Sequence, residues 1–191
     1  EMATRAVAMA REAPEDPYIG LADPDAHARS WDVEALELCD PAAEPSPEAL
    51  QEDAQRAETA ALEGKLISQV ESASAGYNRY QIQLATSNGF SGNFDRSGRS
   101  VSCVAIAGTG SEMESDYDAD SRVFQTDLCD AAIIGRRAAA RSLERVGARK
   151  PKTGAYPILF DERIAASLLG HLLAAANGGA IARGGSWLRD S

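Results

Sequence analysis

The sequence is poor in the side chains that hold metal ions or attack substrates. It contains two histidines, His27 and His171, and three cysteines, Cys39, Cys103 and Cys129. The cysteines are widely spaced and form no Cys-x-x-Cys pair, which disfavours a zinc or dithiol redox motif. With so few histidines, no Ser/His/Asp or Cys/His catalytic set can be assembled. We therefore expect no catalytic residue and no metal ligand in this chain.

Long apolar runs and export signals are also missing. The sequence has no stretch of about 18 apolar residues, so a transmembrane helix is not expected. The first residues are Ala-rich and lack the basic start, apolar centre and cleavage site of a signal peptide. The odd number of cysteines favours free thiols in a reducing compartment. The sequence therefore predicts a cytoplasmic protein with no membrane partner.

Charge is unevenly distributed along the chain, whose formal net charge is -10. Residues 1–64 carry 16 acidic and 4 basic side chains, whereas residues 65–191 carry 13 acidic and 15 basic ones. An acidic half disfavours broad nucleic-acid binding, and a nearly neutral half does not restore it. We therefore expect no nucleic-acid partner.

Turn residues and helix signals divide the N-terminal part of the chain. Residues 1–11 indicate a helix, and the region up to residue 45 is broken by Pro, Asp and Gly. Within it, Trp31–Leu38 predicts a short strand or turn that docks through its apolar side chains. Ser46 and Pro47 then begin a helix that Gly64 ends. We predict that residues 1–45 are the end of an N-terminal domain and a linker, and that residues 46–191 form an α+β domain.

Residues 65–124 have the period of an antiparallel meander of about four strands. Residues 66–74 alternate loosely, and residues 79–84 alternate cleanly, which indicates a strand with one covered face. Asn88-Gly89 predicts a two-residue hairpin turn, because both positions tolerate positive φ. Residues 94–107 predict a long strand, and residues 112–124 a further one. The predicted fold class is α+β, with a β-meander of about four strands packed with flanking helices.

The remainder of the chain predicts a helix, a strand and a helix. Asp130 caps a helix that runs to Val146, and Asp161 caps a last helix that is apolar over a wide face. Between them, residues 156–160 (YPILF) indicate a short buried strand. Pro157 requires that this strand lie at an edge or that the proline stand at the strand start.

One acidic cluster is a candidate site. Its side chains alternate along the chain, so that a strand would place them on one side; they are Glu112, Glu114, Asp116, Asp118 and Asp120. The cluster lacks the glycine and the downstream glutamate of a calcium loop. A solvated strand end or loop is therefore the favoured interpretation, and contact with a cation or a partner is the alternative.

One basic cluster is a second candidate site. Arg137, Arg141 and Arg145 lie four residues apart and form a stripe on their predicted helix. A solvated face that pairs with Glu144 or with the acidic N-terminal half is the favoured interpretation. A nucleic-acid or phosphate site is the alternative.

Four runs of residues carry a family resemblance. They are residues 110–118 (GSEMESDYD), 134–139 (IGRRAA), 152–172 (beginning KTGAYPILFD) and 182–188 (ARGGSWL). Together they resemble the central domain of the TldE, or PmbA, subunits of the TldD/TldE metalloprotease family, also named modulators of DNA gyrase. The last run is similar to the family's Arg-Gly-Thr-Ser-Phe-Leu stretch, with Gly185 in place of Thr. The likeness covers nearly the whole chain and is specific from about residue 76 onward.

The resemblance implies a division of labour between two subunits. TldD-type subunits carry a His-Glu-x-x-x-His zinc motif on a helix, and TldE-type subunits lack it; their complex processes or degrades unfolded peptides. Registered on the Arg-Gly stretch, the zinc ligands correspond here to Leu169, Gly170 and Ala174, none of which binds zinc. The resemblance thus implies a metal-free, non-catalytic subunit without a cofactor, which assists a zinc-bearing TldD-type partner. The peptide- or partner-binding residues it suggests are Arg183, Ser186 and His171.

Family members are more than twice as long as this chain, so we expect a fragment that lacks the C-terminal domain. The main alternative function is a protein-binding module that modulates DNA gyrase or another partner without proteolysis, through the arginine stripe. A self-sufficient metalloenzyme is disfavoured because the chain has too few ligands. The peptide substrate, the oligomeric state and the partner-binding surface stay open.

Overall fold

The computed structural model describes residues 1–15 and 20–188 of the chain. They form two compact units, of which the larger is Asp23–Pro151 and the smaller combines Glu1–Ala22 with Lys152–Ser191. Within the described ranges, no helix is both long enough and apolar enough to cross a membrane.

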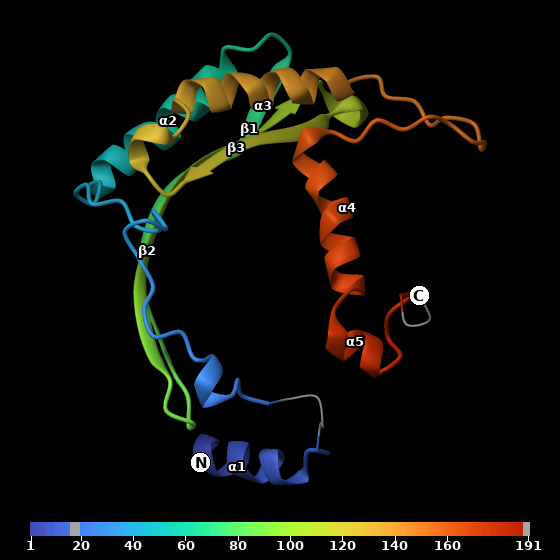
Figure 1. Cartoon of the computed structure of the whole chain (residues 1–191). Coiled ribbons are helices and arrows are strands. Elements are labelled where there is room, and N and C mark those ends of the chain that lie inside the picture. Colours follow the sequence, from blue (N-terminus) through green and yellow to red (C-terminus); the bar gives the residue numbers. More distant parts are fainter. Residues whose placement is uncertain (16–19, 189–191) are drawn as a thin grey trace. The chain divides into compact units, whose positions relative to one another are not determined.

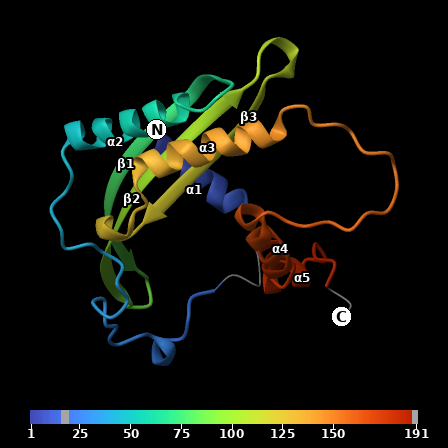
Figure 2. The same ribbon diagram turned by 90° about the horizontal axis from the view of Figure 1, so that it is seen from above.

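The larger unit is an antiparallel sheet with two helices on one face. β1 (Ile67–Ala85) pairs with β2 (Ser91–Ala107), and β2 pairs with β3 (Glu114–Arg122), so that β2 is central. The helices α2 (Pro47–Leu62) and α3 (Ala131–Arg145) lie side by side across that face (Figures 1 and 2). Short 3-10 turns occupy Pro24–Ala26, Gly110–Glu112 and Gln125–Asp127.

The predicted α+β class with flanking helices is confirmed. The prediction of about four strands is not confirmed, because the described sheet has three. The runs 66–74 and 79–84 belong to one strand, because the register with β2 is unbroken from the pair Ser72 and Val104 to the pair Ala85 and Ser91. Two register shifts before Ser72 explain why the first run alternates loosely.

The hairpin between β1 and β2 is longer than the predicted two-residue turn. Its loop spans residues 86–90, and the Thr86 N–H donates to the Phe90 carbonyl at 2.9 Å. Gly89 adopts a φ of +96°, which is the left-handed region that the Asn-Gly pair indicates. The predicted position of the hairpin is therefore correct, and its length is not.

The core lies between the sheet and the two helices, and most of its side chains are small. Alternate residues of β2 from Ser97 to Ala107 face the helices and are buried. They meet Ala57 on α2 and Ile134 on α3. At Gly135 an added Cβ would lie 2.0 Å from the Ala57 carbonyl oxygen. The two helices therefore approach closely at a position that has room for no side chain.

Helix starts follow the predicted caps. The Ser46 hydroxyl accepts the Ala49 N–H at 3.2 Å, and the Asp130 carboxylate accepts the Ala132 N–H at 2.9 Å. Both groups satisfy N–H donors that the first helical turn leaves unpaired. These local signals explain why the predicted starts of α2 and α3 are confirmed.

The smaller unit contains α1 (Met2–Glu12), α4 (Glu162–Ala175) and α5 (Gly178–Ala182). Asp161 caps α4 as predicted, through the Arg163 N–H at 3.0 Å. The prediction of a buried strand at residues 156–160 is wrong. This segment has no regular structure, and Leu159 is fully exposed. Pro157 offers no N–H to a ladder, and no described strand lies beside the segment.

Candidate functional site

The acidic side chains of β3 and the arginines of α3 form a ladder of ion pairs. The pairs join Asp118 to Arg141 and Arg137, and Glu114 and Asp116 to Arg145. Even-numbered residues of β3 face α3, because successive side chains of a strand point to opposite faces. Asp118 is buried and its Arg141 partner is about a fifth exposed, so this rung is shielded from solvent.

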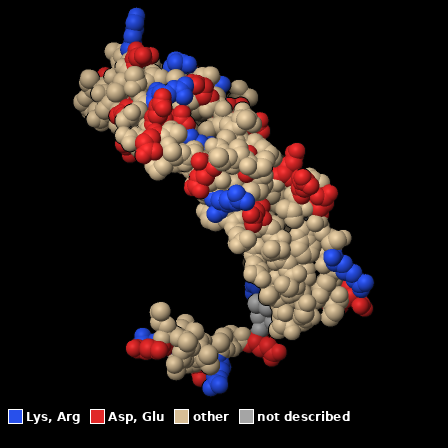
Figure 3. Space-filling view, turned by 90° about the vertical axis from the view of Figure 1, so that its left-hand side faces the viewer, with Lys and Arg blue, Asp and Glu red and all other residues tan. Residues whose placement is uncertain are grey.

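The ladder revises both interpretations of the charged clusters. Glu114, Asp116 and Asp118 lie on one side of β3 and pair with a helix, so they are not a solvated strand end. Glu112 is exposed in the preceding 3-10 turn, and Asp120 pairs with Arg122. The arginine stripe pairs with acidic residues of β3, which were not among its predicted partners. The partners lie in elements that are adjacent only in the fold. Over the upper part of the face drawn in Figure 3, acidic and basic side chains are interleaved.

A second network joins α2, β2 and α3. Arg99 of β2 is buried and donates to Asp53 of α2 at 2.5 Å and to the Gly76 carbonyl at 3.2 Å. Arg56 of α2 pairs with Asp130, the N-cap of α3. This hydrogen bond with Arg56 lowers the pKa of Asp130. The network therefore holds the start of α3 against α2.

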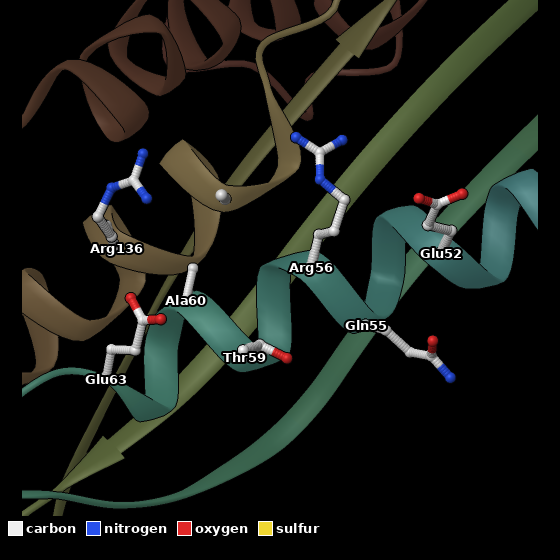
Figure 4. A pocket seen from close by; sticks show the side chains of 8 residues that line it. Glu52, Gln55, Arg56, Thr59, Ala60, Glu63 and Arg136 are labelled. Carbon is white, nitrogen blue, oxygen red and sulfur yellow. The ribbon is translucent and has the colours of Figure 1, made fainter.

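Beside this network, a polar depression of about 410 Å³ lies between α2 and α3 (Figure 4). Its charged lining consists of two arginines and two glutamates, namely Arg56, Arg136, Glu52 and Glu63. Because the two signs balance, the depression favours neither an anion nor a cation.

Asp40 fastens the segment before α2 to the turn before α3. Its carboxylate accepts the N–H groups of Ala42 and Gln125, at 2.8 Å each, and its own N–H donates to the Ser97 hydroxyl at 2.7 Å. The hydrogen bonds from Gln125 and Ala42 lower the pKa of Asp40. Its charged form is therefore part of the folded state.

We expect the larger unit to lose stability in acid. The pKa values of Asp40 and Asp130 are lowered in the folded state, so their contribution is complete above the unfolded pKa of about 3.9 and disappears as pH falls through the folded values. Urea unfolding followed by circular dichroism, from neutral pH to about pH 2.5, measures this loss. The Asp40→Asn variant should show a shallower decline, and an unchanged decline would contradict the assignment.

The three predicted binding residues lie in the smaller unit. His171 is exposed on α4, and Arg183 is exposed after α5. Ser186 is buried, and its hydroxyl donates to the Ala175 carbonyl at 2.5 Å and accepts the Leu188 N–H at 3.1 Å. Ser186 is thus engaged in holding the chain after α5 to the end of α4. A binding role for these residues stays a prediction.

Metal donors are scattered. The described parts of the chain hold no group of three or more His, Cys, Asp or Glu side chains placed for a metal ion. His27 lies in the larger unit beside Phe90, with ring centroids 5.5 Å apart, whereas His171 lies in the smaller one. One turn to either side of His171, α4 carries Ser167, Leu168, Ala174 and Ala175.

The cysteines are free thiols. Burial raises the pKa of Cys103 to about 11, which keeps this thiol protonated at neutral pH. Cys103 therefore fills space in the core as a small apolar side chain, as its position in an apolar strand suggests.

The surface that sequence analysis missed is the far end of β1. The clean alternation of residues 79–84 predicted a covered face, yet Tyr80 and Leu84 are 58% and 57% exposed. On the opposite face, Arg79, Gln81 and Gln83 are exposed as well, because the hairpin end of the sheet extends beyond α2 and α3 (Figure 1). Alternation alone reveals two unlike faces, but not whether another element covers either of them.

Comparison with known proteins connects the larger unit to one family. The model of the PmbA/TldA metallopeptidase central domain matches residues 40–146, which is more than half of the chain. Metalloprotease PmbA of Escherichia coli O157:H7 is 34% identical over 188 residues, which cover 97% of this chain and 41% of that protein. A PmbA homolog of Haemophilus influenzae is 31% identical over 190 residues, with the same shares.

Solved structures share the fold. A candidate modulator of DNA gyrase from Bacteroides thetaiotaomicron has a TM-score of 0.77 and 25% identity, and the match covers 99% of this chain and 43% of that one. TldE from Thermococcus kodakarensis has a TM-score of 0.52 and 19% identity, over 73% of this chain and 30% of that one. At the latter identity, the likeness concerns the fold alone.

The chain spans about two fifths (41%) of the length of the curated relatives it matches. The boundary that we predicted at residue 45 stays a prediction. The matched residues 40–146 contain both helices and the whole sheet of the larger unit. The resemblance found in the sequence is confirmed, and the chain belongs to the PmbA/TldA metallopeptidase family through its central domain.

Proposed function

We propose that this chain is part of a metal-free subunit that handles unfolded peptides for a zinc-bearing TldD-type partner. The observation that carries the proposal is the composition of α4 in a member of this family. The positions that the resemblance assigns to the family's zinc ligands hold Leu169, Gly170 and Ala174, whose side chains offer no donor atom. In this proposal, the subunit contributes no group to bond cleavage and zinc resides in the partner.

The architecture of the larger unit supports a role in holding extended peptide. A three-stranded sheet has two outer edges, and here they belong to β1 and β3. Outer edges present unpaired backbone groups, to which a peptide can add as a further strand. Such binding uses main-chain hydrogen bonds and therefore suits substrates of varied sequence.

The test compares the full-length protein alone with a mixture of it and the TldD-type subunit from the same source. We expect the protein alone to bind no stoichiometric zinc and to cleave no unfolded peptide, and the mixture to cleave. Metal analysis and mass spectrometry of peptide products measure both properties. A mixture in which the partner's motif histidines are replaced by alanine is the control and should be silent. Stoichiometric zinc with cleavage by the protein alone would contradict the proposal.

The second candidate is a modulator that binds another protein without proteolysis, and the description of the Bacteroides relative favours it. Its predicted surface, the arginine stripe, is partly occupied by the ion-pair ladder, since Arg141 is engaged by buried Asp118. Only Arg137 and Arg145 remain more than half exposed. Capture of gyrase by the full-length protein, with no cleavage in any mixture, would favour this candidate over the first.

A further inference from the structure

We infer that the outer edge of β1, from Tyr77 to Ala85, binds an extended and uncharged peptide segment by strand addition. This inference rests on the proposed function for the nature of the occupant. It goes further by choosing between the two sheet edges and by stating which peptide chemistry fits.

The hairpin shows which backbone groups of β1 are free to bind. Thr86 donates its N–H to the Phe90 carbonyl, so these two residues form a hydrogen-bonded pair. Pairing is unbroken from there back to Ser72, and hydrogen-bonded pairs recur at every second residue. The backbone N–H and C=O groups of even-numbered β1 residues therefore form hydrogen bonds with β2. Odd-numbered residues, among them Gln81 and Gln83, direct their N–H and C=O groups outward.

The central strand confirms this alternation independently. Odd-numbered residues of β2 should direct their backbone groups away from β1. The Ser97 N–H does so and donates to the Leu38 carbonyl at 3.0 Å. The Asn93 carbonyl does so as well and accepts the Trp31 indole N–H at 3.2 Å. On β1 no described strand occupies the corresponding outer side.

The side chains along this edge favour apolar neighbours. Tyr80, Ile82 and Leu84 are exposed and lie on one face at every second position. A strand added to β1 would place its own alternate side chains beside them, at about 5 Å between Cβ atoms. Leu84 also lines an apolar pocket of about 360 Å³, together with Trp31 and Phe94. A peptide with large apolar residues at alternate positions would cover this surface.

Charge separates the two edges. Between Ser72 and Ala85, β1 carries a single charged side chain, Arg79, which pairs with Asp95 at 3.0 Å. By contrast, β3 carries the acidic side of the ion-pair ladder. Charged strands repel added strands, whereas a long neutral edge accepts them. The β1 edge is therefore the favoured binding edge, and its favoured occupant is a peptide segment with few charges.

The test uses the full-length protein and two fluorescein-labelled octapeptides. One alternates leucine or valine with serine or threonine, and the other has glutamate at the apolar positions. We expect only the apolar peptide to bind, and to slow hydrogen exchange at the odd-numbered amides of residues 79–85. Gln83→Pro removes one outward N–H and leaves the bonds to β2, so it should weaken binding about tenfold.

Two matched variants isolate the edge. Gln83→Ala keeps the N–H and should bind as the parent does. In β3, too, the backbone groups of odd-numbered residues point to the outer edge, so Ala119→Pro removes an outward N–H there. This variant should also leave binding unchanged. Melting curves verify that each variant is folded. A photo-reactive leucine in the peptide should cross-link to residues 77–85, which tests the site without any substitution.

Several results would overturn the inference. They are equal weakening by both prolines, weakening by neither, exchange protection outside β1, or tight binding of the glutamate peptide. If sedimentation shows a dimer that Gln83→Pro converts to a monomer, the occupant is a second copy of the chain. If the mixture with the TldD-type partner cleaves peptides and Gln83→Pro leaves KM unchanged, the edge assignment fails and the proposed function stands. If no mixture cleaves peptides, the proposed function itself fails.

Discussion

Replacing Gly135 with alanine should cost the larger unit about 3 kcal/mol or more, or prevent its folding. The added Cβ would lie 2.0 Å from the carbonyl oxygen, 2.8 Å from the carbonyl carbon and 3.1 Å from the Cα of Ala57. These are backbone atoms of α2, so no rotamer change can relieve the clash. The helices would have to separate, and the contacts between their small buried side chains would be lost.

The predicted loss of stability is opposite in sign to the usual effect of a glycine-to-alanine replacement in a helix. In an unobstructed helix, alanine in place of glycine stabilises by roughly 0.5–1 kcal/mol. Gly170 on α4 provides that control, because nothing lies within 4 Å of its added Cβ. Urea and thermal unfolding of both variants measure the difference. A Gly135→Ala protein as stable as the parent would mean that α2 and α3 are farther apart than this structure has them.

Replacing Arg141 with alanine should destabilise the larger unit by about 2–3 kcal/mol. Asp118 is buried, and without Arg141 its nearest cation is Arg137, at 3.9 Å. A buried carboxylate with a distant partner keeps most of its desolvation cost. The loss should be below that of a fully buried pair, because Arg141 is itself about a fifth exposed and partly hydrated.

Arg145→Ala is the matched control, since this arginine belongs to the same ladder but its side chain is 55% exposed. Its loss should stay below about 1 kcal/mol, as for other solvent-exposed pairs. Adding Asp118→Ala to Arg141→Ala should recover part of the stability, because no buried charge is then left without its partner. Chemical unfolding of the three variants forms the measurement. Equal losses of stability in Arg141→Ala and Arg145→Ala would contradict the conclusion that the Asp118–Arg141 pair is shielded from solvent.

The candidate surfaces differ in how far they could be predicted. The acidic and basic clusters were recognisable from their spacing, yet their partnership was not, because β3 and α3 are neighbours only in the folded chain. The apolar stripe at Tyr80, Ile82 and Leu84 was visible as alternation. Its exposure was not, because that depends on how far along the sheet the helices extend.

By itself, the sequence determined the features that depend on near neighbours. The starts of three helices follow from Ser46, Asp130 and Asp161, whose side chains reach N–H groups two or three residues away. The hairpin position follows from Asn88-Gly89, and family membership follows from short runs of residues. Each of these signals acts within a few positions and needs no knowledge of the rest of the chain.

The tertiary structure decided the features that depend on distant residues. The two runs that looked like separate strands pair with β2 in one continuous register and form the single strand β1. The close approach of the Ala57 backbone leaves room only for glycine at position 135. The segment at residues 156–160 is apolar enough for a strand but has no described strand to pair with. Burial and pairing are set by elements far apart in sequence, so composition and period can suggest them but cannot assign the partner.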